Sequence, residues 1–380
     1  MSAAKTYDIV IVGAGAAGLG CALSAAAGGA TVLLLEKTAT LGGTVARALI
    51  HTIAGLFDDQ GEFLNEGLPM ELAGRLHKAC PHTRKRRIGK TWVLNADPAV
   101  YSRVISEWIE EAPGIDVHRS ATVVQLQVGS GRIEQLSELF GGETRALSPG
   151  AVVDSTGDAS IARQAGNFVA EGAASGGYIV QVRGMEPAAM EFPKGVAILS
   201  QLRKAVDLGD LPAECASVWL DSGVYPDEAY AKFSIDPLTF DAAAMRSVAE
   251  QLLVHLRALP GFGSAFVHRY GEPGWRDSGR IDGEYCLTEQ DIKQGKRFPD
   301  AACKGAWPIE QWHPQAGIRL EYLPPGCNYD IPLSSLKVAG IGNFWAVGKC
   351  LSAEPRAQAS ARVAGTCWAM GEAVGRHITQ

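Results

Sequence analysis

Apolar residues fall into short runs and stripes that predict the first elements of the chain. Residues 7–12 and 31–35 are mostly apolar and rich in β-branched residues or leucine, which is typical of strands buried on both faces. Between them, residues 19–27 are rich in alanine and leucine, which favours a helix, and Gly28-Gly29 ends it. This strand–helix–strand order predicts an α/β fold.

The rest of the chain carries further elements in the same pattern. Asp97 is expected to cap a helix that begins at Pro98 and stops before Pro113-Gly114. Strands are predicted within 115–128, 151–154, 177–182 and 343–348, and helical stretches over 242–259 and 360–371. The apolar stripe of the helix over 242–259 is predicted to be core and consists of Met245, Val248, Leu252, Leu253 and Leu256.

Glycines form a G-x-G-x-x-G pattern between the first strand and the first helix. Gly13 permits a tight turn, Gly15 lets the backbone approach a pyrophosphate, and Gly18 lets helix and strand pack closely. The following helix offers amide donors and the positive end of its dipole. Glu36, 18 residues after Gly18, can accept hydrogen bonds from ribose hydroxyls and repels a 2′-phosphate. The pattern predicts a site for FAD or NAD, with a ligand-free glycine turn as the competing interpretation.

Three further segments carry a resemblance to known flavoproteins. Residues 37–44 resemble the stretch after the ribose acid in the glutathione-reductase-like fold, where a Gly-Gly pair passes close to the flavin. Residues 151–158 resemble the D-x-T-G-D segment that returns to FAD, although Asp154 could instead cap its own turn. Residues 280–288 resemble an R-x-x-G-x-Y-x-L-T segment. Together they resemble the FAD-dependent oxidoreductase family of split, p-hydroxybenzoate-hydroxylase-like topology, except over roughly 170–275.

The resemblance implies a discontinuous Rossmann-like FAD-binding domain with an inserted α+β substrate domain. The expected FAD-binding domain comprises residues 1–45, 115–168 and 330–380, with a helical excursion over 46–114 and the substrate domain over 169–329. The last helix is expected to direct its amino end at the flavin. The implied FAD contacts are Gly13, Gly15, Ala16, Ala17, Gly18, Glu36, Lys37, Gly42, Gly43, Thr44, Val123 (at the adenine), Thr156, Gly157, Asp158, Gly348, Ser360, Ala361 and Arg362.

Candidate substrate groups lie in segments that the resemblance brings toward the flavin. His313 is the first candidate for a base that removes a proton, and His51 is the second. Arg47 or Arg280 is expected to hold a substrate carboxylate, and Tyr285 is a further candidate. A lone histidine or arginine is often structural, so this alternative stays open for each. No metal-binding spacing occurs, and no metal is expected.

Charge and composition exclude other classes of function. The 380 residues carry 35 basic and 41 acidic side chains, for a net charge of -6, so we expect no nucleic-acid partner. The basic run 84–87 is predicted to be a solvated loop. No apolar run is long enough to span a membrane and no export signal is evident, so a cytoplasmic protein is expected. The 8 cysteines are scattered without a C-x-x-C pair, which indicates neither a disulfide framework nor a zinc site.

The expected activity is that of a dehydrogenase or oxidase acting on a small organic substrate. No second G-x-G-x-x-G occurs, so no separate NAD(P)H domain is expected. Oxygen, a quinone or an electron-transfer protein would reoxidise the flavin. The alternatives are a flavin monooxygenase with an external reductant and a non-catalytic dinucleotide-binding protein. The substrate and the oligomeric state stay open.

Overall fold

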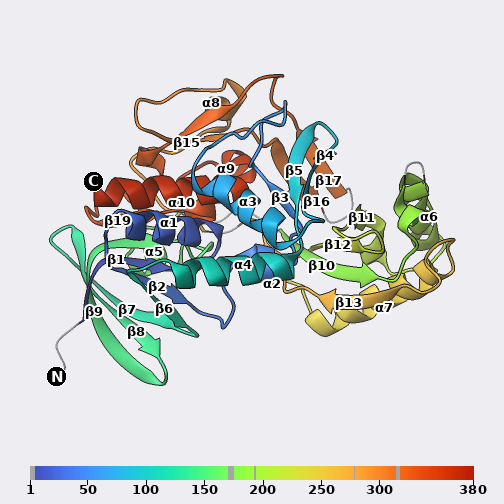
Figure 1. The fold of residues 1–380 in the computed structure, drawn as a ribbon, viewed down its shortest axis with the longest axis horizontal. Helices are drawn as coiled ribbons and strands as arrows, with labels where there is room; N and C mark the ends of the chain where they lie inside the picture. Colours follow the sequence, from blue (N-terminus) through green and yellow to red (C-terminus); the bar gives the residue numbers. More distant parts are fainter. Residues whose placement is uncertain (1–4, 170–174, 192–193, 278, 314–316) are drawn as a thin grey trace.

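A sheet of seven strands gathers distant parts of the chain at one end of the molecule (Figure 1). The computed structural model describes residues 5–169, 175–191, 194–277, 279–313 and 317–380. The strands follow one another in the order β6 (Ile115–Arg119), β2 (Val32–Glu36), β1 (Lys5–Val12), β9 (Glu143–Asp154), β8 (Arg132–Phe140) and β7 (Thr122–Gly129), with β19 (Phe344–Ala346) beside β9.

The parallel strands of this sheet bring their carboxyl ends to one edge. β1 pairs in parallel with β2 and β9, and β19 pairs in parallel with β9. Val12 lies opposite both Leu35 and Asp154, so the turns that follow β1, β2 and β9 are neighbours. Ligands of open α/β sheets bind outside this edge. The sheet therefore brings the glycine loop, Glu36 and the 154–158 turn to one place.

Helix α1 (Ala16–Ala27) packs backbone to backbone against helix α10 (Ala364–Thr379) (Figure 1). A Cβ added at Gly371 would lie 1.9 Å from the carbonyl oxygen of Ala17, and one at Gly20 would lie 2.6 Å from that of Trp368. Any larger residue would force the two helices apart. This contact fixes the carboxyl-terminal helix beside the glycine loop.

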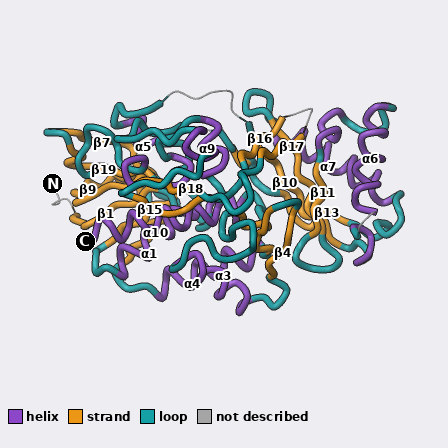
Figure 2. The backbone as a smooth tube through the Cα atoms, turned by 90° about the horizontal axis from the view of Figure 1, so that it is seen from above, coloured by secondary structure: helices purple, strands orange, loops and turns teal. Residues whose placement is uncertain are grey.

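A second, antiparallel sheet lies at the other end of the molecule (Figures 1 and 2). Its strands follow the order β11 (Trp219–Ser222), β12 (Ala229–Ile235), β10 (Gly176–Arg183) and β13 (Phe266–Tyr270), with β14 (Gly274–Trp275) beside the start of β10. Helices α6 (Lys194–Asp207) and α7 (Ala242–Arg257) pack on one face, onto Tyr178, Val180 and Val182 of β10. Two 3₁₀ turns, η1 (Pro187–Met190) and η2 (Ala213–Ser217), complete this part.

Residues 46–114 contain strands as well as helices. Besides α3 (Leu68–Ala79) and α4 (Pro98–Glu111), they form a three-stranded sheet of β3 (Thr52–Ala54), β5 (Thr91–Asn95) and β4 (Arg84–Ile88). The prediction of a loop for the basic run 84–87 was wrong, since this run is edge strand β4. Its cations lie over an aromatic ring of the neighbouring strand, with Lys85 Nζ 5.1 Å from the Trp92 ring.

The remaining elements surround the carboxyl-terminal helices. Two strand pairs, β15 (Ala301–Gly305) with β18 (Tyr329–Pro332) and β16 (Ile309–His313) with β17 (Gly317–Glu321), lie on this side. The short helical segments are α2 (Gly43–Arg47), α5 (Ser160–Gln164), α8 (Glu289–Lys293), η3 (Leu333–Ser335), η4 (Gly348–Cys350) and α9 (Pro355–Ala361). Within the described ranges, no helix has the length and apolar character that a bilayer crossing requires.

The predictions for helices α4 and α7 are confirmed, and the prediction of one continuous helix over 360–371 is wrong. Asp97 caps α4 by accepting a hydrogen bond from Ala99 N at 2.7 Å, and Pro98 is its first residue. The predicted apolar stripe of α7 is buried. The single helical stretch predicted over 360–371 is instead two helices, because Val363 adopts an extended conformation (φ -71, ψ 150) between α9 and α10. The break gives α10 an amino end of its own.

Candidate active site

The turn between β1 and α1 leaves open space beside one glycine. Gly15 has φ -80, and a Cβ added to it would meet no atom within 4 Å. Gly13 instead has φ +105, and a Cβ added to Gly18 would lie 2.0 Å from the Gly13 carbonyl oxygen. The first amides of α1, at Ala16 and Ala17, have no acceptor within the helix. Open space beside free helix amides fits the pyrophosphate of a dinucleotide.

Glu36 is held at the end of β2 with its carboxylate turned toward this loop. Its Oε2 accepts a hydrogen bond from Ala14 N at 3.0 Å, and its Oε1 accepts two from Thr38, from N at 2.9 Å and from Oγ1 at 2.8 Å. Only 5% of Glu36 is exposed. A carboxylate oxygen accepts more than one hydrogen bond, so Oε2 can also take a ribose hydroxyl.

The Gly42-Gly43 pair lays the following loop directly on the glycine turn. Gly42 N donates to the carbonyl oxygen of Ala14 at 2.8 Å. Gly43 has φ +54, and a Cβ added to it would lie 2.9 Å from the Cα of Gly15. Lys37 and Thr44 are exposed on either side of this contact. The arrangement places residues 42–43 against the glycine turn, and the expected contact of this pair with the flavin stays a prediction.

The 154–158 turn is organised by a buried carboxylate. Asp154 accepts hydrogen bonds from Thr156 N at 3.0 Å and Thr156 Oγ1 at 2.6 Å, and from Ile161 N and Ala162 N at 3.1 and 3.0 Å. Asp154 therefore caps its own turn and the start of α5, which is the alternative that the sequence left open. Burial raises the pKa of this carboxyl. Thr156 and residues 157–158 are half-buried beside it.

A third loop closes against the start of α1. Gly348 has φ +70, and a Cβ added to it would lie 2.9 Å from that of Ala17. Val347 N donates to the Asp154 carbonyl oxygen at 3.0 Å, which ties this loop to β9. Gln358 Nε2 of α9 donates to the carbonyl oxygen of Lys349 at 2.6 Å. Loops from four parts of the chain thus surround the amino end of α1, and we call this set the cofactor cradle: residues 13–18, 42–44, 154–158 and 347–350.

The carboxyl end of α9 is buried, and the residue that follows it, Arg362, is a cation. Ser360 and Ala361 are buried, and Ser360 Oγ lies 2.7 Å from the hydroxyl of Tyr329. Arg362 Nη1 lies 3.3 Å from Asp277 Oδ1, and its Nη2 donates to the Glu310 carbonyl oxygen at 3.3 Å. The Ser360 side chain is therefore used within the protein, whereas Arg362 belongs to a charged group of residues.

That group contains two cations that the sequence analysis did not select. Arg276 follows β14, and Lys349 follows Gly348 in the cradle. Lys349 Nζ donates to the Trp275 carbonyl oxygen at 2.5 Å, which joins the two segments. We call Arg276, Lys349 and Arg362 the cation cluster. The position of Lys349 next to a cradle glycine was a usable signal, whereas nothing in the sequence places Arg276 here.

His51 lies in a buried polar network and not in the cation cluster. Its Nε2 is 3.2 Å from Asp221 Oδ2, and its ring stacks on Tyr230 at 3.7 Å between centroids. Arg86 and Lys232 contact the same carboxylate at 2.6 and 3.0 Å. Burial lowers the pKa of His51 to about 4, with the Lys232 charge adding to the effect. This neutral, buried ring joins the β10–β13 sheet to the strand β3 side of the molecule.

His313 and Tyr285 also lie apart from the cation cluster. His313 is the exposed last residue of β16, and neighbours in a strand point to opposite faces, so it does not share the face on which Trp312 contacts Arg276. The Tyr285 hydroxyl donates to Asp291 Oδ2 at 2.7 Å and accepts from Lys296 Nζ at 2.9 Å. These contacts place the Tyr285 hydroxyl in the hydrogen-bond network at the start of α8.

The two arginines predicted to hold a carboxylate differ in their pairing. Arg47 Nη2 lies 2.6 Å from Glu272 Oε2, and its Nη1 lies 3.7 Å from Glu36 Oε1, so acidic partners already compensate its charge. Arg280 is buried and its Nε has no hydrogen-bond partner among the described residues. Its backbone pairs with Val169.

Val123, the expected adenine contact, lies in β7 at the edge of the large sheet. Its carbonyl oxygen accepts a hydrogen bond from Gln164 Nε2 at 3.4 Å. The neighbouring Ala121 N donates to the Glu36 carbonyl oxygen at 2.9 Å, which brings the start of β7 next to Glu36, and the adenine contact stays a prediction.

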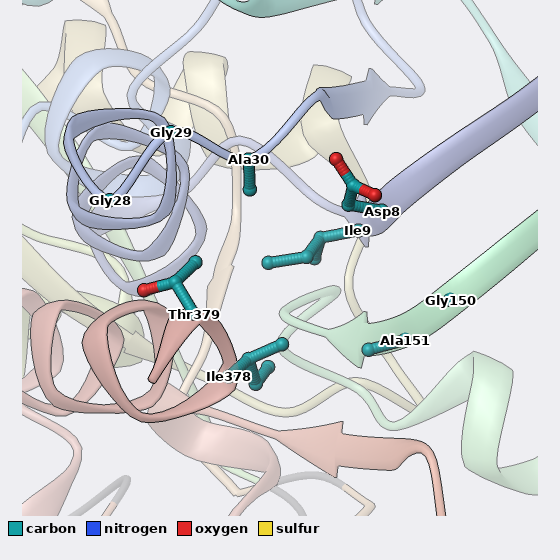
Figure 3. A pocket seen from close by; sticks show the side chains of 9 residues that line it. All are labelled: Asp8, Ile9, Gly28, Gly29, Ala30, Gly150, Ala151, Ile378 and Thr379. Carbon is teal, nitrogen blue, oxygen red and sulfur yellow. The ribbon is translucent and has the colours of Figure 1, made fainter.

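A hollow of about 450 Å³ lies at the opposite end of β1 from the cradle (Figure 3). It is lined by the residues Asp8, Ile9, Gly28, Gly29, Ala30, Gly150, Ala151, Ile378 and Thr379. Asp8 accepts hydrogen bonds from Thr31 N and Oγ1 at 2.8 and 2.7 Å, so its carboxylate is already used. The hollow shares no lining residue with the cofactor cradle.

Three solved structures are similar to this chain at low sequence identity. A triple mutant of the flavin-dependent brominase Bmp2 has a TM-score of 0.49 at 13% identity and covers 98% of this chain and 80% of its own. A geranylgeranyl bacteriochlorophyll reductase-like protein from Thermoplasma acidophilum has a TM-score of 0.47 at 12% identity, with 99% and 77% covered. The OxyS anhydrotetracycline hydroxylase from Streptomyces rimosus has a TM-score of 0.48 at 16% identity, and the match covers 74% of this chain but 54% of the hydroxylase.

Two sequence comparisons bear on the family. An NADH:fumarate oxidoreductase from Klebsiella pneumoniae (strain 342) is 49% identical over 119 residues, which are 29% of this chain and 11% of that protein, so this chain spans a small part of its relative. The family described as FAD dependent oxidoreductase matches residues 8–379. Since this match spans nearly the whole chain and the cradle fits a dinucleotide, the chain belongs to the FAD dependent oxidoreductase family and is an FAD-dependent enzyme.

Proposed function

We propose that the enzyme is a dehydrogenase or oxidase that removes a hydride from a small organic substrate. The bond broken is a C–H bond beside oxygen or nitrogen, or in a C–C unit that becomes unsaturated. FAD, when bound, accepts the two electrons of the hydride, and the substrate also releases a proton. Oxygen, a quinone or an electron-transfer protein then takes the electrons away.

One observation carries this proposal, the positive charge next to the cradle. Lys349 and Arg362 come from segments on either side of α9, and the charge of Arg362 helps to lower the pKa of Lys349, after burial. The separate amino end of α10 adds the positive end of a helix dipole on the same side. Fixed positive groups at the place where negative charge develops favour uptake of a hydride.

The residues of the cradle have their own part in this reaction. The glycine loop and the amides of α1 would hold the pyrophosphate, and Glu36 would orient the ribose. The Gly43–Gly15 and Gly348–Ala17 contacts fix the loops against one another, so little reorganisation is needed when the cofactor binds. Rigid positioning of the reactants is itself a large contribution to catalysis.

An anaerobic reduction experiment tests the proposal against a monooxygenase. FAD-loaded protein is mixed without air with hydroxy acids, amino acids and saturated acids, in the absence of NAD(P)H, and the flavin absorbance is followed. The proposal predicts bleaching by at least one donor. Flavin that stays oxidised with every donor but is bleached by NADH or NADPH contradicts the proposal and favours a monooxygenase.

A further inference from the structure

Of the three cations in the cluster, only Arg362 lies in an ion pair with an acidic side chain of the described residues. Arg362 lies 3.3 Å from Asp277, whose other oxygen accepts a hydrogen bond from Ser175 Oγ at 2.5 Å. In the part of the chain that the structure describes, neither Arg276 nor Lys349 forms an ion pair. A cation withdrawn from water without a counterion is unfavourable, so such a pair of cations is suited to receive an anion.

Arg276 is held flat against an aromatic ring, and of its side-chain nitrogens only Nη1 has a hydrogen-bond partner among the described residues. Its guanidinium carbon lies 4.1 Å from the centre of the Trp312 ring, and its Nη1 donates to the carbonyl oxygen of Gly176. A Cβ added at Gly177 would lie 2.5 Å from Arg276 Nη2, so the glycine makes room for this group. One acceptor leaves most of the guanidinium donors available, and their planar arrangement matches a carboxylate.

Lys349 provides a second cation beside the same segment. Its Nζ donates to the Trp275 carbonyl oxygen at 2.5 Å, one residue before Arg276. Burial is the main reason that the pKa of Lys349 is lowered to about 8 and that of Arg276 to about 10, and the charge of Arg362 contributes to both shifts. A bound anion would offset this destabilisation of the two charged side chains, so the site favours an anion.

The local charge favours a ligand with a low negative charge. Three carboxylates, those of Asp158, Asp277 and Glu310, act on the three cations of the cluster, so no surplus of positive charge is left to compensate a second negative charge on the ligand. Glu310 is already occupied, since both of its oxygens accept hydrogen bonds from indoles, from Trp307 at 2.8 Å and Trp312 at 2.5 Å. A carboxylate carries one charge, whereas a phosphate monoester carries about -1.5 to -2. The Trp312 ring, which Arg276 contacts, also borders the site with aromatic surface.

We propose that Arg276 and Lys349 bind the carboxylate of the organic substrate, with the apolar part of the substrate against Trp312. This carboxylate site rests on the proposed function, because it names the class of substrate that would give up the hydride. It also replaces Arg47, which is paired with Glu272, as the carboxylate ligand.

Binding of benzoate to the FAD-loaded protein tests this assignment. Benzoate cannot be oxidised as proposed, so the flavin absorption change on titration reports binding alone, and benzamide is its uncharged counterpart. We expect a saturable change with benzoate, and affinities at least about tenfold weaker for benzamide and for inorganic phosphate. Equal binding of benzoate and benzamide, tighter binding of phosphate, or no benzoate binding would overturn the proposal.

Variants locate the binding at the two cations. Arg276→Gln and Lys349→Gln should each weaken benzoate at least about tenfold. Gly177→Ala should also weaken it, because the new methyl displaces Nη2 while the charge stays, and this variant serves if Arg276→Gln does not fold. Lys337→Gln is the control, since Lys337 is also a lysine whose pKa burial lowers and whose Nζ donates to a backbone carbonyl, that of Gly342. It should bind benzoate within about twofold of the original protein.

FAD content and affinity, measured on each variant, separate the two anions that these cations could serve. Loss of FAD affinity with unchanged benzoate binding would mean that the cations serve the cofactor, and would overturn the carboxylate site. The proposed function fails in a different experiment, since it requires flavin bleaching by an oxidisable donor. Benzoate binding without such bleaching would leave the carboxylate site standing and reject the dehydrogenase.

Discussion

Replacement of Gly15 by alanine should separate FAD binding from folding. The added Cβ would meet no protein atom within 4 Å, and φ -80 is an ordinary conformation for alanine. Alanine is a worse helix N-cap than glycine, which lowers stability by about 0.5–1 kcal/mol. The lower conformational entropy of the unfolded alanine variant raises stability by about 0.4–1 kcal/mol and so offsets this loss. The free energy of unfolding without FAD should therefore change by no more than about 0.5 kcal/mol.

The same methyl group occupies the space where the pyrophosphate approaches the backbone. Displacing the phosphates from two helix amides removes two charge-assisted hydrogen bonds, each of which contributes about 1.5–3 kcal/mol. The lower value for both bonds gives a loss of about 3 kcal/mol in binding free energy. The FAD dissociation constant should rise roughly 100-fold. Equilibrium titration of apoprotein with FAD measures it, beside urea unfolding of the same samples.

Two other glycines serve as controls for this prediction. Gly74→Ala, in α3, also adds a Cβ that meets nothing within 4 Å, and should leave FAD binding unchanged. Gly18→Ala would place its Cβ 2.0 Å from the Gly13 carbonyl oxygen, and should lower stability by about 1–3 kcal/mol. If Gly15→Ala binds FAD within about threefold of the original affinity, the assignment of this space to the pyrophosphate is refuted.

Two further predictions concern stability. The pKa of His51 falls from 6.5 to about 4 on folding, so the unfolded chain binds a proton more readily, and about 3 kcal/mol of stability present above pH 6.5 should be lost between pH 6.5 and pH 4. Urea unfolding across this range should show that loss. His51→Phe keeps a ring on Tyr230 and should reduce the slope of the unfolding free energy against pH by the equivalent of one bound proton. An unchanged slope would contradict a neutral, buried His51. Gly371→Ala would place a Cβ 1.9 Å from the Ala17 carbonyl oxygen and should lower the melting temperature and the FAD affinity together. An unaffected FAD affinity would mean that the position of α10 does not matter to the cradle.

The parts of the fold that are determined by residues close together in the sequence could be predicted from the sequence. The glycine turn, the Asp97 cap and the buried stripe of α7 each follow from local patterns of a few residues. The basic run 84–87 was misleading because a charged stretch also suits an edge strand, where Lys85 and Arg87 lie over one aromatic ring of β5, that of Trp92. Its charge alone does not distinguish the two.

The cation cluster could not be predicted because it is assembled from distant segments. Arg276 and Lys349 are far apart in the sequence and meet only when β14 pairs with the start of β10. The break before α10 also has no local signal, since neither glycine nor proline stands at Arg362 or Val363. Both features depend on tertiary packing, which the pattern of the chain does not contain.

The absorption spectrum of the purified protein, before and after acid precipitation, tests the central claim that the cradle holds FAD. We expect bands near 375 and 450 nm, about one flavin per chain, and release of the flavin into the supernatant, since the cradle holds it by hydrogen bonds and packing. Protein that shows no flavin bands, even after incubation with FAD, would contradict the account.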